Sequence, residues 1–321
     1  MKNPASSRRH FLRSLTAAGA WAAGMGSPLR ATAAKPEWKT AIGMNGFMSS
    51  ARKYGKSFPI EDVLGYTARA GFDGVELVEA WPHKAYPVTS DREAVGKLRE
   101  QHARHGLQIF SLQNGAGGAF APNLEARRNW IAQMRGRIEL AKALGCDCIG
   151  MWPGGGLRGQ TLDEAIKRLA GSFREVAAMA DDQGVVAAFE IEPPFQFNTE
   201  EHLRRILESA NDPRVKTIYD PSHFDLMNKS AGRPHEMLKR IGVEHIGYVH
   251  FTDTDGTRRD GGTSKHLPAG DGHIDVPASF ETLHEGGFNG WVMIDGWQIP
   301  DPYDAGTKGL RAIKDYMKRA R

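Results

Sequence analysis

Two glutamates stand two positions apart at the end of an apolar run, in the segment AAFEIEPPF (187–195). If the run is a β-strand, its side-chain period of two puts Glu190 and Glu192 on the same face. Two like charges at the mouth of an apolar strand cost free energy unless another group pairs with them. The arrangement therefore indicates that these carboxylates meet a partner.

The next three candidate strands along the chain end in Asp220, His250 and Asp295. With Glu190, these residues predict a divalent-metal site, and its oxygen-rich ligand set with one histidine suits Mn, Mg, Co or Zn. Each residue alone also has a structural explanation: an ion pair for Glu190, a turn cap for Asp220 and a hydrogen-bonded core position for His250. Their joint occurrence at successive strand ends favours the metal.

The elements that must position these residues repeat one theme, in which short apolar strands alternate with amphipathic helix patterns. The expected strands are 40–45, 74–79, 107–112, 147–152, 185–190, 215–220, 246–251 and 291–295. Eight strands alternating with eight helix patterns predict a parallel α/β fold, and the count favours a single-domain (β/α)8 TIM barrel over residues 34–321. The rival open sheet usually has a glycine-rich turn after its first strand, which IGMNGFMSS is not.

Several helix patterns carry their own boundary signals. Asp91 is a predicted N-cap, and Thr161 with Glu164 forms a predicted capping box. Glycines such as Gly145 close the patterns, as is common at helix C-termini. These signals support a regular alternation of strand and helix.

The longest irregular stretch, 252–276, follows the seventh strand, where barrel enzymes keep active-site loops. Within it, His266 and Arg258 are candidates to bind substrate hydroxyls or a carboxylate, or else they are solvated loop residues. Trp152, at the end of the fourth strand, is a further substrate-binding candidate. Glu192 either meets substrate hydroxyls or is a rim carboxylate, since glutamate is usually exposed.

Taken together, these motifs resemble the xylose-isomerase-like superfamily of sugar isomerases and epimerases over nearly all of residues 40–318. The matching features are Gly184 through Glu190, the Asp-x-x-His of Asp220 and His223, His250, the Gly-Asp-Gly turn at 270–272, and the segment GGFNGWVMID (286–295). The chain departs from the family at its last ligand, because Asp295 stands where the family usually has glutamate. A carboxylate one methylene shorter can still bind metal, but it would place an acid/base oxygen differently.

The resemblance implies one divalent metal held by Glu190, Asp220, His250 and Asp295. It also implies that the metal polarises a carbonyl and acidifies the neighbouring C–H, while two carboxylates remove and return the proton. Glu190 and Asp295 are the candidates for that pair. His223 is expected to contact the substrate or to orient Asp220.

The first 33 residues have the composition of a twin-arginine export signal. Arg8 and Arg9 precede a weakly hydrophobic stretch that closes on the small residues Ala31-Thr32-Ala33, and that stretch is too short and glycine-rich for a good transmembrane helix. Cleavage there removes five positive charges and turns the formal net charge of +4 into −1. We therefore expect an exported, periplasmic protein with no membrane anchor after cleavage and no charge advantage for nucleic acid.

The two cysteines, Cys146 and Cys148, fall short of a zinc set, and a bridge between them would close a strained ring. We expect them to be small buried apolar residues. On one strand, both side chains would lie on the same face.

Three other functions share the expected scaffold. Apurinic endonucleases use extra histidines, but here the third strand runs into Gln113 and Asn114. A lyase acting on keto-glycosides would use the same proton abstraction, and a non-catalytic sugar-binding barrel would keep only the binding residues. The expected partner is a small carbohydrate, and the sequence permits a homo-oligomer without specifying one.

Overall fold

A computed structural model describes residues 35–320, apart from 80, 83, 228–231 and 260–261. The expected export signal at 1–33 lies outside the described residues. In the part of the chain that is described, no helix combines the length and the apolar character needed to span a membrane.

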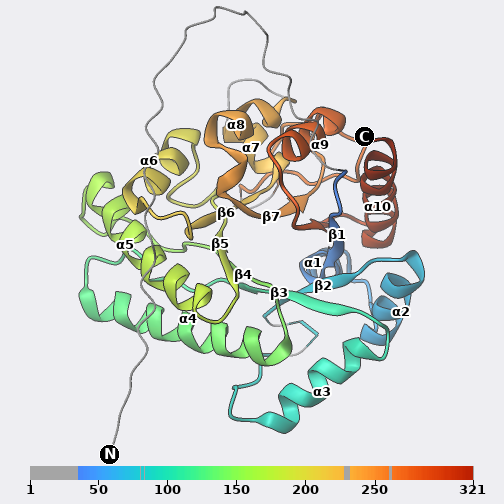
Figure 1. Cartoon of the computed structure of the whole chain (residues 1–321), viewed down its shortest axis with the longest axis horizontal. Helices are drawn as coiled ribbons and strands as arrows, with labels where there is room; N and C mark the ends of the chain where they lie inside the picture. Colours follow the sequence, from blue (N-terminus) through green and yellow to red (C-terminus); the bar gives the residue numbers. More distant parts are fainter. Residues whose placement is uncertain (1–34, 80, 83, 228–231, 260–261, 321) are drawn as a thin grey trace, which may run out of the picture. The chain divides into compact units, whose positions relative to one another are not determined.

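Eight parallel strands, each hydrogen-bonded to the next in chain order, close into a barrel when β8 pairs with β1 (Figure 1). The strands are β1 (Lys39–Gly43), β2 (Gly74–Val78), β3 (Gln108–Asn114), β4 (Cys148–Met151), β5 (Val186–Phe189), β6 (Lys216–Tyr219), β7 (Ile246–Phe251) and β8 (Trp291–Ile294). The predicted (β/α)8 fold and all eight predicted strands are confirmed.

Helices surround the barrel and follow the strands (Figure 1). The described helices are α1 (Met44–Tyr54), α2 (Ile60–Ala70), α3 (Arg92–Ala103), α4 (Leu124–Leu144), α5 (Leu162–Asp181), α6 (Glu200–Ala210), α7 (Pro221–Met227), α8 (Pro234–Ile241), α9 (Val276–Glu285) and α10 (Pro302–Arg319), with a short 3-10 turn η1 (Val243–His245) before β7. The Asp91 side chain caps α3, and the Thr161–Glu164 capping box opens α5. Gly145 closes α4 in the left-handed conformation, as its sequence position predicted.

The first strand is shorter than expected, because helix α1 begins at Met44 rather than after Asn45. The chain therefore turns directly from strand to helix at the carboxyl end of β1. This turn puts Asn45 on a helix that starts over the barrel mouth, a position that the sequence did not mark.

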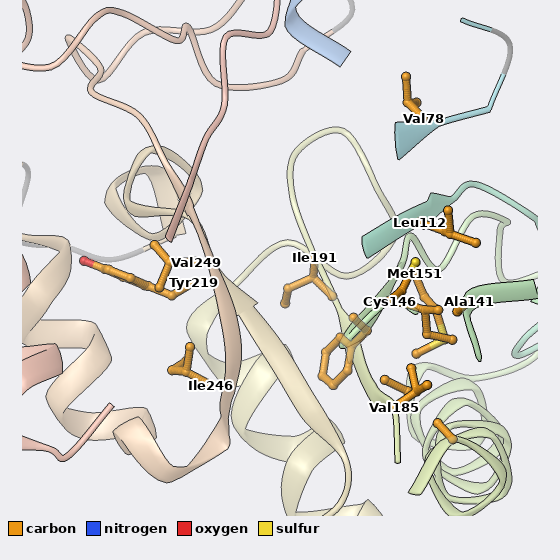
Figure 2. Packing of buried hydrophobic residues seen from close by; sticks show 14 of the residues in the cluster. Val78, Leu112, Ala141, Cys146, Met151, Val185, Ile191, Tyr219, Ile246 and Val249 are labelled. Carbon is orange, nitrogen blue, oxygen red and sulfur yellow. The ribbon is translucent and has the colours of Figure 1, made fainter. Parts of the chain in front are cut away.

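A large apolar core fills the space between the strands and the surrounding helices. Figure 2 shows Cys146 in this core among Ala141, Met151 and Val185. Cys148 instead lies inside the barrel. Strand β4 begins at Cys148, so Cys146 precedes the strand and the alternation of side chains along it does not apply to Cys146. Both cysteines are buried and unbridged, as expected, but they do not share a face. Burial raises the pKa of the Cys146 thiol, which suits an unreactive packing role.

A second, separate cluster closes the barrel interior towards the amino ends of the strands. Its members are Ala41, Phe110, Cys148, Ala188, Ile218, Tyr248, Trp291 and Met293. Phe110 stacks on Trp291 with ring centroids 4.6 Å apart and meets Tyr248 edge-on at 5.5 Å. We call this cluster the inner plug. It is a floor of packed side chains, so ligands reach the barrel interior only from the carboxyl ends of the strands.

Candidate metal and sugar site

A layer of ionisable groups lies directly above the inner plug, towards the carboxyl ends of the strands, because side chains two positions apart on a strand point to the same face. Two positions beyond Ala188, Ile218, Tyr248 and Met293 stand Glu190, Asp220, His250 and Asp295. All four of these ionisable residues are buried, with at most 4% of their surface exposed. The structure therefore brings together the four residues predicted to hold a metal.

Glu190 uses its two carboxylate oxygens differently. One oxygen, Oε2, accepts a hydrogen bond of 2.6 Å from the indole Nε1 of Trp152. The other, Oε1, lies 3.0 Å from Nδ1 of His250. Trp152, predicted to bind substrate, thus also fixes the orientation of the glutamate.

Asp220 is held firmly on one side only. Its Oδ1 accepts from the backbone N–H of Ser222 at 2.7 Å, from the Ser222 hydroxyl at 2.6 Å and from the N–H of His223 at 3.2 Å. Its Oδ2 is buried and has no hydrogen-bond partner among the described residues. A buried carboxylate oxygen of this kind suits a bound cation.

His250 is supported from the side opposite Glu190. Its Nε2 lies 3.1 Å from Oε2 of Glu76, a buried glutamate on β2. The Tyr248 hydroxyl donates a 2.9 Å hydrogen bond to the other oxygen of Glu76. Histidine ligands of metals commonly carry such a carboxylate on their second nitrogen, and here Nδ1 of His250 lies on the side of Glu190 and Asp295. Sequence reasoning missed Glu76.

Asp295 is surrounded by donors. The side-chain Nδ2 of Asn45 lies 3.0 Å from each carboxylate oxygen, and the backbone N–H of Trp297 donates to Oδ1 at 2.9 Å. Nδ1 of His266 lies 3.3 Å from the same Oδ1. The nearest approach of Asp295 to His250 is 3.6 Å.

Glu192 and His223 meet on the neighbouring wall. Nε2 of His223 lies 3.2 Å from Oε2 of Glu192, which also accepts a hydrogen bond from the Thr263 hydroxyl. Nδ1 of His223 is hydrogen-bonded to the Ser264 hydroxyl at 2.6 Å. Thr263 and Ser264 come from the long loop, so this loop folds back over the site.

Burial and close charges shift several protonation equilibria in the metal-free site. Burial, together with the charge of Glu190, raises the pKa of Glu192 to about 8. Burial opposes the charged imidazole of His250, but the carboxylates of Glu190 and Glu76 outweigh it and raise its pKa. In the same way Asp295 overcomes burial and raises the pKa of His266 to about 9. Such perturbed groups gathered in one hollow are typical of functional sites.

A cavity of about 270 Å³ at the carboxyl ends of the strands is lined by Glu190 and Asp295 but not by Asp220 or His250. Its lining contains all of the predicted substrate-binding residues except one, and it adds Asn45, Pro194, Phe195, Thr263, Trp297 and Gln298. The exception is Arg258, which is exposed and absent from the described lining. The structure therefore does not bring Arg258 to the site.

A larger hollow, of about 730 Å³, opens at the amino ends of the strands beside Asp147 and Trp291. The indole Nε1 of Trp291 donates to the Asp147 carboxylate at 2.8 Å. None of the three groups of potential metal ligands found among the described residues lies there. We place the chemistry in the smaller cavity, because barrel enzymes act at the carboxyl ends of their strands.

The side chains present fit a divalent cation. Ligand atoms of Glu190, Asp220 and His250 all lie within 4.8 Å of one another, as do those of Asp220, His223 and His266. Glu190, Glu192 and His223 form a third such group. Asp295 belongs to none of these groups among the described residues, although its Oδ2 lies 3.6 Å from Nδ1 of His250.

Comparison with known proteins agrees with this architecture. The family model described as xylose isomerase-like TIM barrel matches residues 64–316, and the chain belongs to that family.

Two relatives and one solved structure show the range of the family. An inosose dehydratase from Clostridium botulinum is 24% identical over 292 residues, covering 81% of this chain and 91% of the relative. An L-ribulose-5-phosphate 3-epimerase UlaE from Escherichia coli is 24% identical over 256 residues, covering 78% of this chain and 87% of the relative. The crystal structure of IolI with a bound zinc atom superimposes with a TM-score of 0.66 at 19% identity, covering 88% of this chain and 99% of that one.

Proposed function

We propose that the protein is a divalent-metal-dependent sugar isomerase or epimerase that moves a proton on the carbon beside a carbonyl. The observation that carries the proposal is the convergence of Glu190, Asp220 and His250, whose ligand atoms lie within 4.8 Å of one another. Of the three, Glu190 lines the cavity at the carboxyl ends of the strands. Relatives of both the epimerase and the dehydratase type support an enzymatic role. We carry over the sugar as the substrate class on the same basis.

Within this proposal, the bound metal would polarise the substrate carbonyl and make the adjacent C–H more acidic. Glu190 is the group that removes the proton, because it lines the cavity and Trp152 and His250 hold its carboxylate from either side. Asp295 is the predicted second carboxylate that returns the proton. A proton returned to the opposite face of the same carbon gives the epimer, and one returned to the neighbouring carbon gives the isomer.

The walls of the cavity suit a small carbohydrate. Trp152 and Trp297 present flat aromatic surface, on which the C–H face of a sugar ring packs. Glu192, His223 and Thr263 supply polar groups for hydroxyls on the adjoining wall. A cavity of about 270 Å³ corresponds to a ligand of roughly monosaccharide size, near the lower end of ordinary ligand sites.

A lyase is the second candidate, and the similarity to inosose dehydratase favours it. It would abstract the same proton through Glu190 but expel a group from the neighbouring carbon. Glu192, whose pKa is raised to about 8 by burial and by Glu190, is placed to donate a proton to a leaving oxygen. The two candidates differ only in the fate of the common intermediate.

Proton exchange in D2O tests the proposal and separates the candidates. Free ketoses, aldoses and keto-glycosides are incubated with the protein with and without added Mn²⁺, Co²⁺ or Zn²⁺ and followed by NMR. Metal-dependent deuterium incorporation with a sugar product supports the isomerase or epimerase, and an unsaturated product supports the lyase. Absence of any bound or activating divalent metal would refute both.

The matched variants are Glu190→Gln and Glu175→Gln, the latter at an exposed position on α5. Loss of exchange in the first alone is the expected outcome. Ligand binding that survives in Glu190→Gln, with no exchange in the wild type, would identify a non-catalytic sugar-binding barrel instead.

We also propose that the protein is exported through a twin-arginine signal at residues 1–33. Arg8 and Arg9 with the small-residue pattern at 31–33 support this. Replacing both arginines by lysine should retain the precursor in the cytoplasm, and cell fractionation with N-terminal sequencing of the mature chain measures it.

A further inference from the structure

We infer that His266, from the loop after β7, supplies the fourth metal ligand in place of Asp295, and that Asp295 instead orients His266. The inference deepens the proposed function and rests on it. It starts from the departure seen at position 295, where the chain has a carboxylate one methylene shorter than the family pattern.

The position of Asp295 does not suit direct ligation. Its carboxylate oxygens both lie 3.0 Å from Nδ2 of Asn45, and Oδ1 also accepts the N–H of Trp297. These donors hold the short side chain near the wall formed by α1 and the β8 end. Accordingly, Asp295 joins no group of mutually close ligand atoms among the described residues, whereas Glu190, Asp220 and His250 do so together.

His266 fills the complementary position. It is 2% exposed, and neither of its ring nitrogens has a hydrogen-bond partner within the described part of the chain. Its Nε2 lies 3.9 Å from Oδ2 of Asp220, a further buried atom without a hydrogen-bond partner among the described residues. Asp220 belongs both to the group with Glu190 and His250 and to the group that contains His266. One cation beside Asp220 Oδ2 would satisfy both atoms.

The backbone on either side of His266 is fixed. Leu267 and Asp253 exchange two backbone hydrogen bonds, of 2.8 and 3.0 Å, and the N–H of Lys265 donates to the carbonyl of Thr257 at 2.9 Å. The loop therefore presents the imidazole from an anchored position rather than from a free tip.

The loop is tied down a second time by the side chain of Asp253. Its carboxylate accepts the backbone N–H groups of Gly270, Gly272 and Ile274. The Gly-Asp-Gly turn at 270–272 thus braces the segment that carries His266, which gives that motif a structural role.

The second nitrogen of His266 completes the assignment. Nδ1 lies 3.3 Å from Asp295 Oδ1, the geometry in which a carboxylate fixes the tautomer and ring orientation of a metal-ligating histidine. His250 is supported in the same manner by Glu76 at 3.1 Å. Each histidine then has one nitrogen beside a supporting carboxylate and the other beside a proposed ligand, Glu190 for His250 and Asp220 for His266. The site therefore has two carboxylate–histidine pairs rather than one.

The test uses Co²⁺ as the probe, loaded into the purified protein. X-ray absorption at the cobalt edge counts coordinated imidazoles, and competition with a chelator gives the Kd of Co²⁺. We expect two imidazoles in the wild type, one in His266→Gln, and a Kd about 100-fold higher in that variant. His273→Gln, in the same loop but half-exposed, should keep both imidazoles and the wild-type Kd.

The double variant Asp295→Glu/His266→Gln tests whether a longer carboxylate at position 295 can replace His266 as the fourth ligand. The longer carboxylate can reach the cation, so we expect the double variant to regain most of the lost affinity with a single imidazole. This variant also shows that His266→Gln weakens binding through the ligand set and not through misfolding, which circular dichroism monitors independently.

The outcomes are distinguishable. One imidazole in the wild type, two in His266→Gln, or an unchanged Kd in His266→Gln would overturn the inference and leave the proposed function standing. A wild-type protein that binds no Co²⁺ at all would remove the proposed function, and the inference with it.

Discussion

Two adjacent layers inside the same barrel are equally buried and yet opposite in chemistry. The inner plug is built of apolar side chains that pack ring against ring, as between Phe110 and Trp291. One strand-step further along, the layer of Glu190, Asp220, His250 and Asp295 is ionisable and is only partly satisfied by hydrogen bonds. Burial alone therefore does not separate a structural layer from a functional one.

The difference lies in what each layer does to the free energy of folding. Apolar side chains of the plug stabilise the fold as their surface leaves water. Burying carboxylates that meet other carboxylates costs free energy unless a cation or donor compensates. The ionisable layer thus opposes folding in the metal-free protein, whereas the inner plug supports folding throughout. Variants of the two layers should accordingly separate loss of activity from loss of stability.

The largest effect is expected in the ionisable layer. Glu190→Gln removes the proposed base, so turnover should fall by about 10²–10⁴-fold. The free energy of unfolding of the metal-free variant should change little, because one carboxylate of a crowded buried cluster is neutralised while His250 keeps its contact with Glu76. Steady-state kinetics and urea denaturation measure the two quantities on the same preparation. A variant that retained activity but unfolded easily would show that Glu190 stabilises the fold, as the inner plug does, and would contradict the difference between the two layers.

A change in the plug should have the reverse signature. Phe110 is fully buried between Trp291 and Tyr248, so Phe110→Ala should lower the free energy of unfolding by about 3–5 kcal/mol. Urea denaturation followed by circular dichroism measures the loss. Activity of the fraction that remains folded should be close to that of the wild type, and a selective loss of turnover at full stability would contradict this assignment.

Tyr248 joins the two layers and should give an intermediate, mixed result. Its ring packs in the plug while its hydroxyl donates to Glu76, the glutamate behind His250. Tyr248→Phe keeps the ring but leaves a buried carboxylate oxygen short of a donor, which should cost about 1–3 kcal/mol of stability. Since Glu76 then supports His250 less well, the Kd of Co²⁺ should rise about 10-fold. An effect on stability with no change in Kd would show that the layers are independent.

The smallest effect is expected outside both layers. Arg258 is exposed and does not line the described cavity, so Arg258→Ala should change kcat/KM by less than about twofold and stability by less than about 0.5 kcal/mol. Kinetics on the best substrate found in the exchange screen provide the measurement. A large rise in KM would show that the loop brings Arg258 to the substrate during the reaction.

The strand-end residues were predictable because one local rule positions them. An apolar run with period-two alternation predicts both the strand and the side of the sheet to which its last side chain points, as with Ala188 followed by Glu190. The cap residues Asp91 and Thr161 were predictable for the same reason, since their hydrogen bonds span only three residues. Short-range patterns of this kind need no knowledge of the remaining fold.

The residues that were missed depend on contacts between distant parts of the chain. Asn45 reaches Asp295 across 250 positions because α1 starts directly after β1. Glu76 lies mid-strand in GVELV, where its lone charge was the available signal, but its partner His250 is on β7. Thr263 and Ser264 come from a loop whose path follows no periodic pattern. Tertiary geometry, not propensity, selects these side chains.

The loop at 252–276 also has a consequence for how such a protein can evolve. The carboxylates belong to the strands, whereas Thr263, Ser264 and His266 all belong to one segment whose base is clasped by the Asp253–Leu267 bridge. Segments closed at the base can be exchanged without repacking the barrel. Recombination or loop grafting at this clasp would therefore replace Thr263, Ser264 and the proposed ligand His266 in a single event, while the carboxylates at the strand ends stay in place.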